Sequence, residues 1–158
     1  MKAIADVMTE ALTETLETMA FCSVNPVTDD MVIPPRLVHV KMSYKGPKEG
    51  CLQILGGWEL GRQIAECIGC VEDIEDRFVI DAWKEICNVL SGLVIPAIAD
   101  SQADIYDITV PVATLKEQVP AWNEFVELSG AQVLNVEGCA VATRLNIATC
   151  YEKETVKS

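Results

Sequence analysis

The sequence predicts an α+β domain in which helices pack on an antiparallel sheet. Apolar residues recur at helical spacing over 4–20, 58–68 and 79–95, and they alternate at strand spacing over 37–44, 51–55, 105–112, 132–136 and 139–150. The resulting order is helix, two strands, two helices and three strands. A chain of 158 residues, half of them hydrophobic, is expected to form one domain spanning 1–158.

The first half opens with a helix and a hairpin. The apolar side of the first helix consists of Ile4, Met8, Ala11, Leu12, Leu16 and Met19. A proline-containing loop is expected over 25–35. In the strand that follows, Val38, Val40, Met42 and Tyr44 alternate with His39, Lys41 and Ser43. The segment 45–50 is a turn to the partner strand at 51–55, and Gly56-Gly57 separates that strand from the second helix.

The second half contains the longest helix and most of the strands. The apolar face of that helix consists of Val79, Ala82, Trp83, Ile86, Val89, Leu90 and Leu93. Pro96 is expected to kink or end it. The strand at 105–112 has Pro111 near its end, and the last two strands flank a tight turn at Glu137-Gly138. Residues 116–127 show no clear period and are expected to form a loop and a short helix.

Weak internal matches suggest two related halves. An offset of 68 residues aligns Thr13, Glu17 and Ala20 with Asp81, Glu85 and Asn88. The same offset aligns the alternating strand at 38–44 with 106–112. Glu49-Gly-Cys51 also recurs as Glu137-Gly-Cys139, at a different offset.

Charge and hydropathy argue against several classes of partner and against secretion or membrane insertion. The net charge of −12 would repel polyanions, so nucleic acid and anionic membrane surfaces are poor partners. Asp6 and Glu10 interrupt the N-terminus, so no secretory signal is recognised. The longest apolar stretch, 89–99, is too short to span a bilayer and contains Pro96. A cytoplasmic location is therefore expected.

The seven cysteines are expected to be reduced thiols. Their number is odd and no export signal accompanies them. Cys67-x-x-Cys70 could bind zinc or exchange disulfides. A structural zinc site usually needs a second such pair or two histidines, whereas the chain has a single histidine. Buried packing at a helix end is the favoured interpretation.

One face of the long helix carries a compact polar group. At about 100° per residue, Asp81, Glu85 and Asn88 fall within roughly 60° of one another, opposite the apolar face. Gly92 projects onto the same face, so a partner could approach the backbone there closely. An acid and an amide three residues apart on a helix surface are most often simply solvated. The pattern alone therefore does not define a site.

The wider pattern is more specific. Asp81-x3-Glu85-x2-Asn88-x22-Pro111 resembles the signature of the CheC/CheX/FliY family of chemotaxis phosphatases, and the element order resembles that family over nearly the whole chain. The first half has Glu17 and Ala20 where a second motif would lie. A single motif in the second half is most similar to CheX, whose members form homodimers. The resemblance implies a CheC-like fold with helices on one face of an antiparallel sheet, two pseudo-repeated halves and a homodimer.

The resemblance also implies a function. The substrate would be the aspartyl phosphate of a CheY-like response regulator, and the protein would act as its phosphatase, a hydrolase of two-component signalling. Asn88 would orient the attacking water and Glu85 would dock the regulator's lysine, while Asp81, Gly92 and Pro111 would serve partner binding. Asp81 also suits the start of a helix, and Pro111 suits the shaping of a strand end. No metal or cofactor of its own is implied, because the regulator supplies Mg²⁺.

The absence of other catalytic motifs agrees with that expectation. The sequence has no Cys-x5-Arg loop, no Asp/His cluster and no Gly-Lys-Ser/Thr phosphate loop, and His39 is far in sequence from the motif. Two alternatives remain open. One is a non-catalytic module that binds a phosphorylated regulator or a flagellar-switch component. The other is a structural partner that assembles through its sheet edge, with Arg144 and Asn146 on an outward face. The paired Glu85 and Asn88 favour the enzyme.

Overall fold

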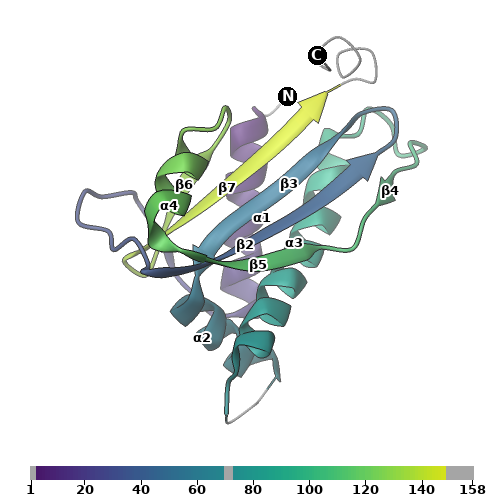
Figure 1. The fold of residues 1–158 in the computed structure, drawn as a ribbon. Coiled ribbons are helices and arrows are strands. Elements are labelled where there is room, and N and C mark those ends of the chain that lie inside the picture. Colours follow the sequence, from purple (N-terminus) through teal and green to yellow (C-terminus); the bar gives the residue numbers. More distant parts are fainter. Residues whose placement is uncertain (1–2, 70–72, 149–158) are drawn as a thin grey trace.

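An antiparallel sheet of seven strands organises the computed structural model, which describes residues 3–69 and 73–148. Its strands are β1 (Val24–Asn25), β2 (Arg36–Lys45), β3 (Glu49–Gly57), β4 (Asp107–Ile108), β5 (Val112–Glu117), β6 (Gln132–Val136) and β7 (Cys139–Ala148). The spatial order is β1-β6-β7-β3-β2-β4, with β5 also paired to β2 (Figure 1). The helices in the same residues are α1 (Ile4–Met19), α2 (Trp58–Gly69), α3 (Asp76–Ile98) and α4 (Gln118–Val126).

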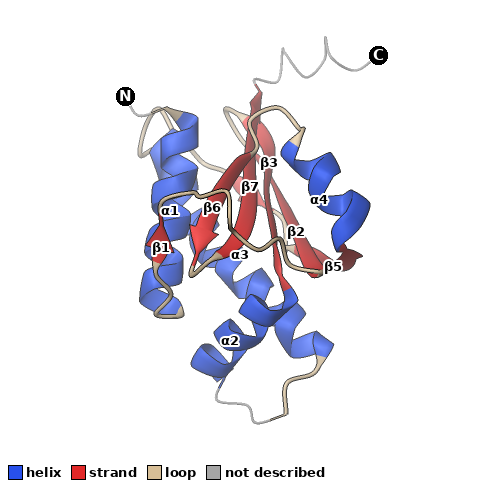
Figure 2. Ribbon diagram, turned by 90° about the vertical axis from the view of Figure 1, so that its left-hand side faces the viewer, coloured by secondary structure: helices blue, strands red, loops and turns tan. Residues whose placement is uncertain are grey.

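The main core lies between one face of the sheet and the helices α1, α2 and α3 (Figure 2). Alternation along β2 directs Val38, Val40, Met42 and Tyr44 into this core, as the sequence predicts. Trp83 is fully buried at its centre. A side-chain carbon at Gly56 or Gly61 would lie only 2.3 or 2.5 Å from the Trp83 indole. Glycine is therefore required at both positions for α3 to pack this closely.

A second, smaller core lies on the opposite face of the sheet. Helix α4 covers it (Figure 2), and its Trp122 and Phe125 pack on Leu37, Leu55, Ala140 and Ala142. The three helices predicted from long apolar periodicity, α1, α2 and α3, lie together on one face, as expected. The short helix expected somewhere in 116–127 is α4, and it is the exception to that one-sided arrangement.

The predicted strand at 105–112 is interrupted. Tyr44 pairs with Ile108 and Lys41 pairs with Val112, so three residues of the edge strand lie opposite two of β2. Thr109 forms two hydrogen bonds with Ser43 across the break, both of 2.9 Å. The Thr109 amide donates to the Ser43 carbonyl, and the Thr109 hydroxyl accepts from the Ser43 amide. Pro111 has no amide hydrogen to donate, which explains why regular pairing resumes only at Val112.

Two further expectations are corrected in whole or in part. Pro96 does not end α3, which continues to Ile98, because only one helical hydrogen bond is lost there, in the final turn; a kink at Pro96 stays a prediction. Cys67 is exposed rather than buried, and Cys70 lies outside the described residues.

The strand order supports two related halves. The pair β7–β3 is central, with β6 and β2 outside it and then β1 and β5. In this order, the strands of α1-β1-β2-β3 and those of α3-β5-β6-β7 occupy corresponding places on either side of the β3–β7 pair. The predicted match of α1 with α3 agrees with this strand order. The predicted match of 38–44 with 106–112 is wrong, because the place of β2 beside β3 corresponds to the place of β6 beside β7. The Glu-Gly-Cys match is out of register by two residues, because it aligns Glu49, the first residue of β3, with Glu137, whereas β7 begins at Cys139.

Candidate functional site

The polar face of α3 points to solvent. Asp81, Glu85, Asn88 and Gly92 are all exposed, whereas the intervening residues include buried Ala82, Trp83, Ile86, Cys87 and Leu90. This separation follows from the helical period, because the buried stripe and the polar group lie on opposite sides of one helix. The structure thus brings four of the five predicted site residues onto one exposed face.

The polar side chains on this face have no bonding partner among the residues that the structure describes. Across residues 3–69 and 73–148, the side chains of Asp81, Glu85 and Asn88 form no hydrogen bond or ion pair. The backbone of Asn88 is fixed more firmly, since its carbonyl accepts a 2.7 Å hydrogen bond from the Ser91 hydroxyl. The Asn88 amide and the Glu85 carboxylate are therefore free to contact a water molecule or a partner.

Gly92 lies one helical turn beyond Asn88. A side-chain carbon added at Gly92 would meet no atom within 4 Å. The protein itself therefore does not require glycine here, in contrast to Gly56 and Gly61. Close approach by an external partner would give this glycine a purpose.

Pro111 is not on the exposed face. It is buried at the interruption between β4 and β5. Ala113, two residues further along, packs against the core beneath α3, and strand alternation directs Pro111 to the same side. Its burial agrees with the interpretation that it shapes the strand end and leaves direct contact with a partner to other residues.

The sequence did not predict an exposed apolar edge beside Pro111. Val110 and Val112 are 79% and 66% exposed, and Ile108 is 44% exposed. The alternation over 105–112 matches that of β2, whose corresponding residues are buried, so the sequence pattern predicts burial for these residues as well. Their exposure follows from the interrupted edge strand, which no periodic signal shows.

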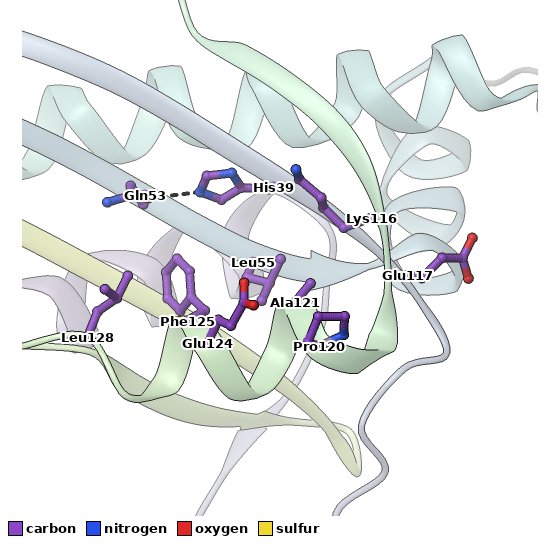
Figure 3. A pocket seen from close by; sticks show the side chains of 10 residues that line it. All are labelled: His39, Gln53, Leu55, Lys116, Glu117, Pro120, Ala121, Glu124, Phe125 and Leu128. Atoms are coloured by element: carbon purple, nitrogen blue, oxygen red, sulfur yellow. Dashed lines mark hydrogen bonds between the residues drawn. The ribbon is translucent and has the colours of Figure 1, made fainter.

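A cavity lies on the other side of the sheet. It is open to solvent, has a volume of about 480 Å³ and lies between α4 and the strands β2, β3 and β5; Figure 3 shows the side chains that line it. His39 lies there, with Nε2 2.8 Å from Oε1 of Gln53 and its ring edge-to-face with Phe125. Burial lowers the pKa of His39, although the hydrogen bond to Gln53 acts in the opposite direction. The sheet separates His39 from the polar face of α3, so the two do not form one site.

Comparison with known proteins shows the fold. No protein-family model and no curated protein matches the chain. Among solved structures, the CheX protein of Vibrio vulnificus matches 93% of this chain and 97% of its own, with 16% identity and a TM-score of 0.69. The CheX of Desulfovibrio desulfuricans matches 92% and 99%, with 15% identity and a TM-score of 0.67. The chain has the CheX fold.

A third solved structure with this fold adds a partner of its own. It is the complex of CheX with CheY, BeF₃ and Mg²⁺ from Borrelia burgdorferi, which matches 92% of this chain and 97% of that one at 16% identity, with a TM-score of 0.58. The CheX fold confirms the architecture that the sequence motif implied. Among the described residues, no helix is both long and apolar enough to cross a membrane.

Proposed function

We propose that the protein is a phosphatase for the aspartyl phosphate of a CheY-like response regulator. Asn88 orients the attacking water, and Glu85 forms a charge-assisted hydrogen bond with the regulator's active-site lysine. The observation that carries this proposal is the exposed, unengaged pair Glu85 and Asn88 on one face of α3 in a CheX fold. The complex of the Borrelia CheX with CheY supports the class of partner.

The chemistry requires little from the phosphatase. Transfer of a phosphoryl group to water needs an in-line nucleophile and stabilisation of charge on the phosphoryl oxygens. In a response regulator, the bound Mg²⁺ and a lysine already supply that stabilisation, so a positioned water is the missing part. The carboxamide of Asn88 accepts a hydrogen from this water and aims its lone pair at phosphorus, without itself being protonated. Correct placement of reacting groups contributes a factor of about 10² or more.

The other residues serve docking. Glu85 holds the regulator's lysine through an ion pair that strengthens when water is excluded from the interface. Asp81 and Gly92 lie on the same exposed face and contact the docked regulator. Pro111 acts indirectly, by shaping the edge beside α3. Homodimer formation, which the resemblance implies, stays a prediction.

The test is the decay of phosphate on a phosphorylated CheY-like regulator with Mg²⁺. Wild type should accelerate the decay, and Asn88→Ala and Glu85→Ala should each lose most of the acceleration. Asn123→Ala and Glu127→Ala change the same residue types at exposed positions near α4 and should retain it. Circular dichroism and a thermal melt establish that each variant is folded.

A contrary outcome identifies the alternative. Wild type that fails to accelerate decay, yet binds the phosphorylated regulator more tightly than the unphosphorylated one, would be a binding module. Equal affinity for both forms, or none, would exclude a role that depends on the phosphate.

A further inference from the structure

Two thiols from distant parts of the sequence meet at one carbonyl group. Sγ of Cys22 and Sγ of Cys67 each lie 3.6 Å from the carbonyl oxygen of Ala20. The two sulfurs are therefore separated by at most twice that distance. Cys22 follows the end of α1, whereas Cys67 belongs to the last turn of α2.

The position of Cys22 is fixed by its backbone. The amides of Ala20 and Cys22 both donate to the Leu16 carbonyl, at 3.1 and 3.2 Å. Phe21 between them adopts a φ of 54°, the left-handed conformation that turns the chain at a helix end. Ser23 is held in turn by the Glu137 carboxylate, which accepts from its amide at 3.1 Å. Cys22 is only 4% exposed, so its thiol stays at this point beside α2.

Cys67 is the accessible member of the pair. It is exposed, and only two helical residues follow it in α2. A disulfide requires the two sulfurs to come within about 2 Å. A side chain in the last turn of a helix is less confined than one in its interior, so rotation of the Cys67 side chain toward Cys22 is the smaller of the two possible movements.

We propose that Cys22 and Cys67 form a disulfide when the protein meets hydrogen peroxide. In the first step, the Cys67 thiolate attacks a peroxide oxygen, the O–O bond breaks, and the products are the Cys67 sulfenic acid and, after protonation, water. In the second step, the Cys22 sulfur attacks the Cys67 sulfur, the S–O bond breaks, and a second water leaves. Two thiols are oxidised by two electrons, and one peroxide is reduced to two waters. This inference does not depend on the proposed phosphatase.

The order of the two steps follows from burial. Burial, together with the nearby charges of Glu137 and Cys67, raises the pKa of the Cys22 thiol to about 11. Few Cys22 side chains are thiolates at neutral pH, so Cys22 is a poor first nucleophile and a slow second one. Exposed Cys67 reacts with peroxide first. The second step should become faster as pH rises toward 11.

The pairing differs from the one that the sequence motif would suggest. Cys67-x-x-Cys70 is the spacing of dithiol oxidoreductases. In the described structure, however, the thiol that shares a contact atom with Cys67 is Cys22. The disulfide would join the ends of α1 and α2, two helices of the layer that supports α3. Closing a loop of this length should raise the melting temperature by about 5–10 °C.

Peptide mapping of the full-length protein tests the proposal. Trypsin cleaves after Lys2, Arg36, Arg62 and Arg77, so Cys22 and Cys67 fall in separate peptides, 3–36 and 63–77. Peroxide treatment should produce a reducible species that links them. A Cys67–Cys70 disulfide would instead remain within peptide 63–77 and lower its mass by two hydrogens.

Matched variants decide the assignment. Cys70→Ser should retain the link between the two peptides, and Cys139→Ser, at a partly exposed cysteine elsewhere, should also retain it. Cys67→Ser should abolish it; this position is exposed, so the variant should fold normally. Loss of the link in Cys70→Ser, a purely internal disulfide, or sulfinic acid at Cys67 with Cys22 still reduced would each overturn the proposal.

Discussion

Nε1 of Trp83 donates a 3.0 Å hydrogen bond to the carbonyl of Gly57, and this buried contact fixes α3 to the end of β3. The indole lies against Gly56 and Gly61, so its position determines how α3 is rotated about its own axis. With Trp83 directed inward, the helical period places Asp81 and Glu85 outward. The orientation of the candidate site is therefore set by a core residue that is fully buried.

Replacement of this anchor should cost stability. Trp83→Phe removes the donor to Gly57 and leaves unfilled volume in the core, so the free energy of unfolding should fall by about 2–4 kcal/mol. The matched control is Trp58→Phe, because Trp58 is only half-buried at the edge of the core and its indole donates a solvent-exposed hydrogen bond to the carboxylate of Asp76. Its cost should be about 1 kcal/mol or less. Urea denaturation measures the free energy of unfolding of both variants. Equal decreases in the two variants would show that Trp83 contributes no more to stability than Trp58 does.

Gly92→Ala should separate stability from function. Because a side-chain carbon at Gly92 meets no atom and alanine is the better helix former, the free energy of unfolding should rise by about 0.5–1 kcal/mol. If a regulator docks closely on this face, the same variant should slow dephosphorylation by raising KM. Urea denaturation measures the free energy of unfolding, and the phosphate-decay assay measures KM. An unchanged KM in a stabilised variant would exclude close approach at Gly92.

His39 should make stability depend on pH. Its pKa is lowered in the folded protein by burial, and Lys116 and Lys41 lower it further, so the unfolded chain binds a proton more readily. The free energy of unfolding should then decrease as pH falls below the ordinary histidine pKa of about 6.5, and level off below the folded pKa. His39→Gln should flatten that part of the profile, whereas Lys116→Met should raise the pKa of His39.

The check on His39 is direct because the chain has a single histidine. An NMR titration of its ring protons gives the folded pKa without an assignment problem. A measured value at or above 6.5 would contradict the expectation. Phosphatase activity should not follow this titration, since the sheet separates His39 from the polar face of α3.

Much of this architecture can be predicted from the sequence, and the exceptions have physical causes. The helices α1, α2 and α3 carry long apolar stripes, and Glu85 and Asn88 share a face by helical geometry alone. Helix α4 has only nine residues and includes Pro120, so its two buried anchors, Trp122 and Phe125, give too short a periodic signal. The break at 109–111 is equally hidden, because alternation in sequence continues through a bulge that only the pairing with β2 reveals.

Asn88→Asp is the sharpest test of the candidate catalytic residue. The substitution conserves size but replaces the amide with a carboxylate, which repels the incoming phosphoryl group and Glu85 and presents no N–H donor. We expect the acceleration of phosphate decay to fall about 10²-fold or more, with the free energy of unfolding changed by less than about 0.5 kcal/mol, because Asn88 is exposed. Asn123→Asp on α4 adds the same charge elsewhere and should leave the rate unchanged. If Asn88→Asp kept more than about a tenth of the acceleration, placement of water by the carboxamide could not be the main source of the rate.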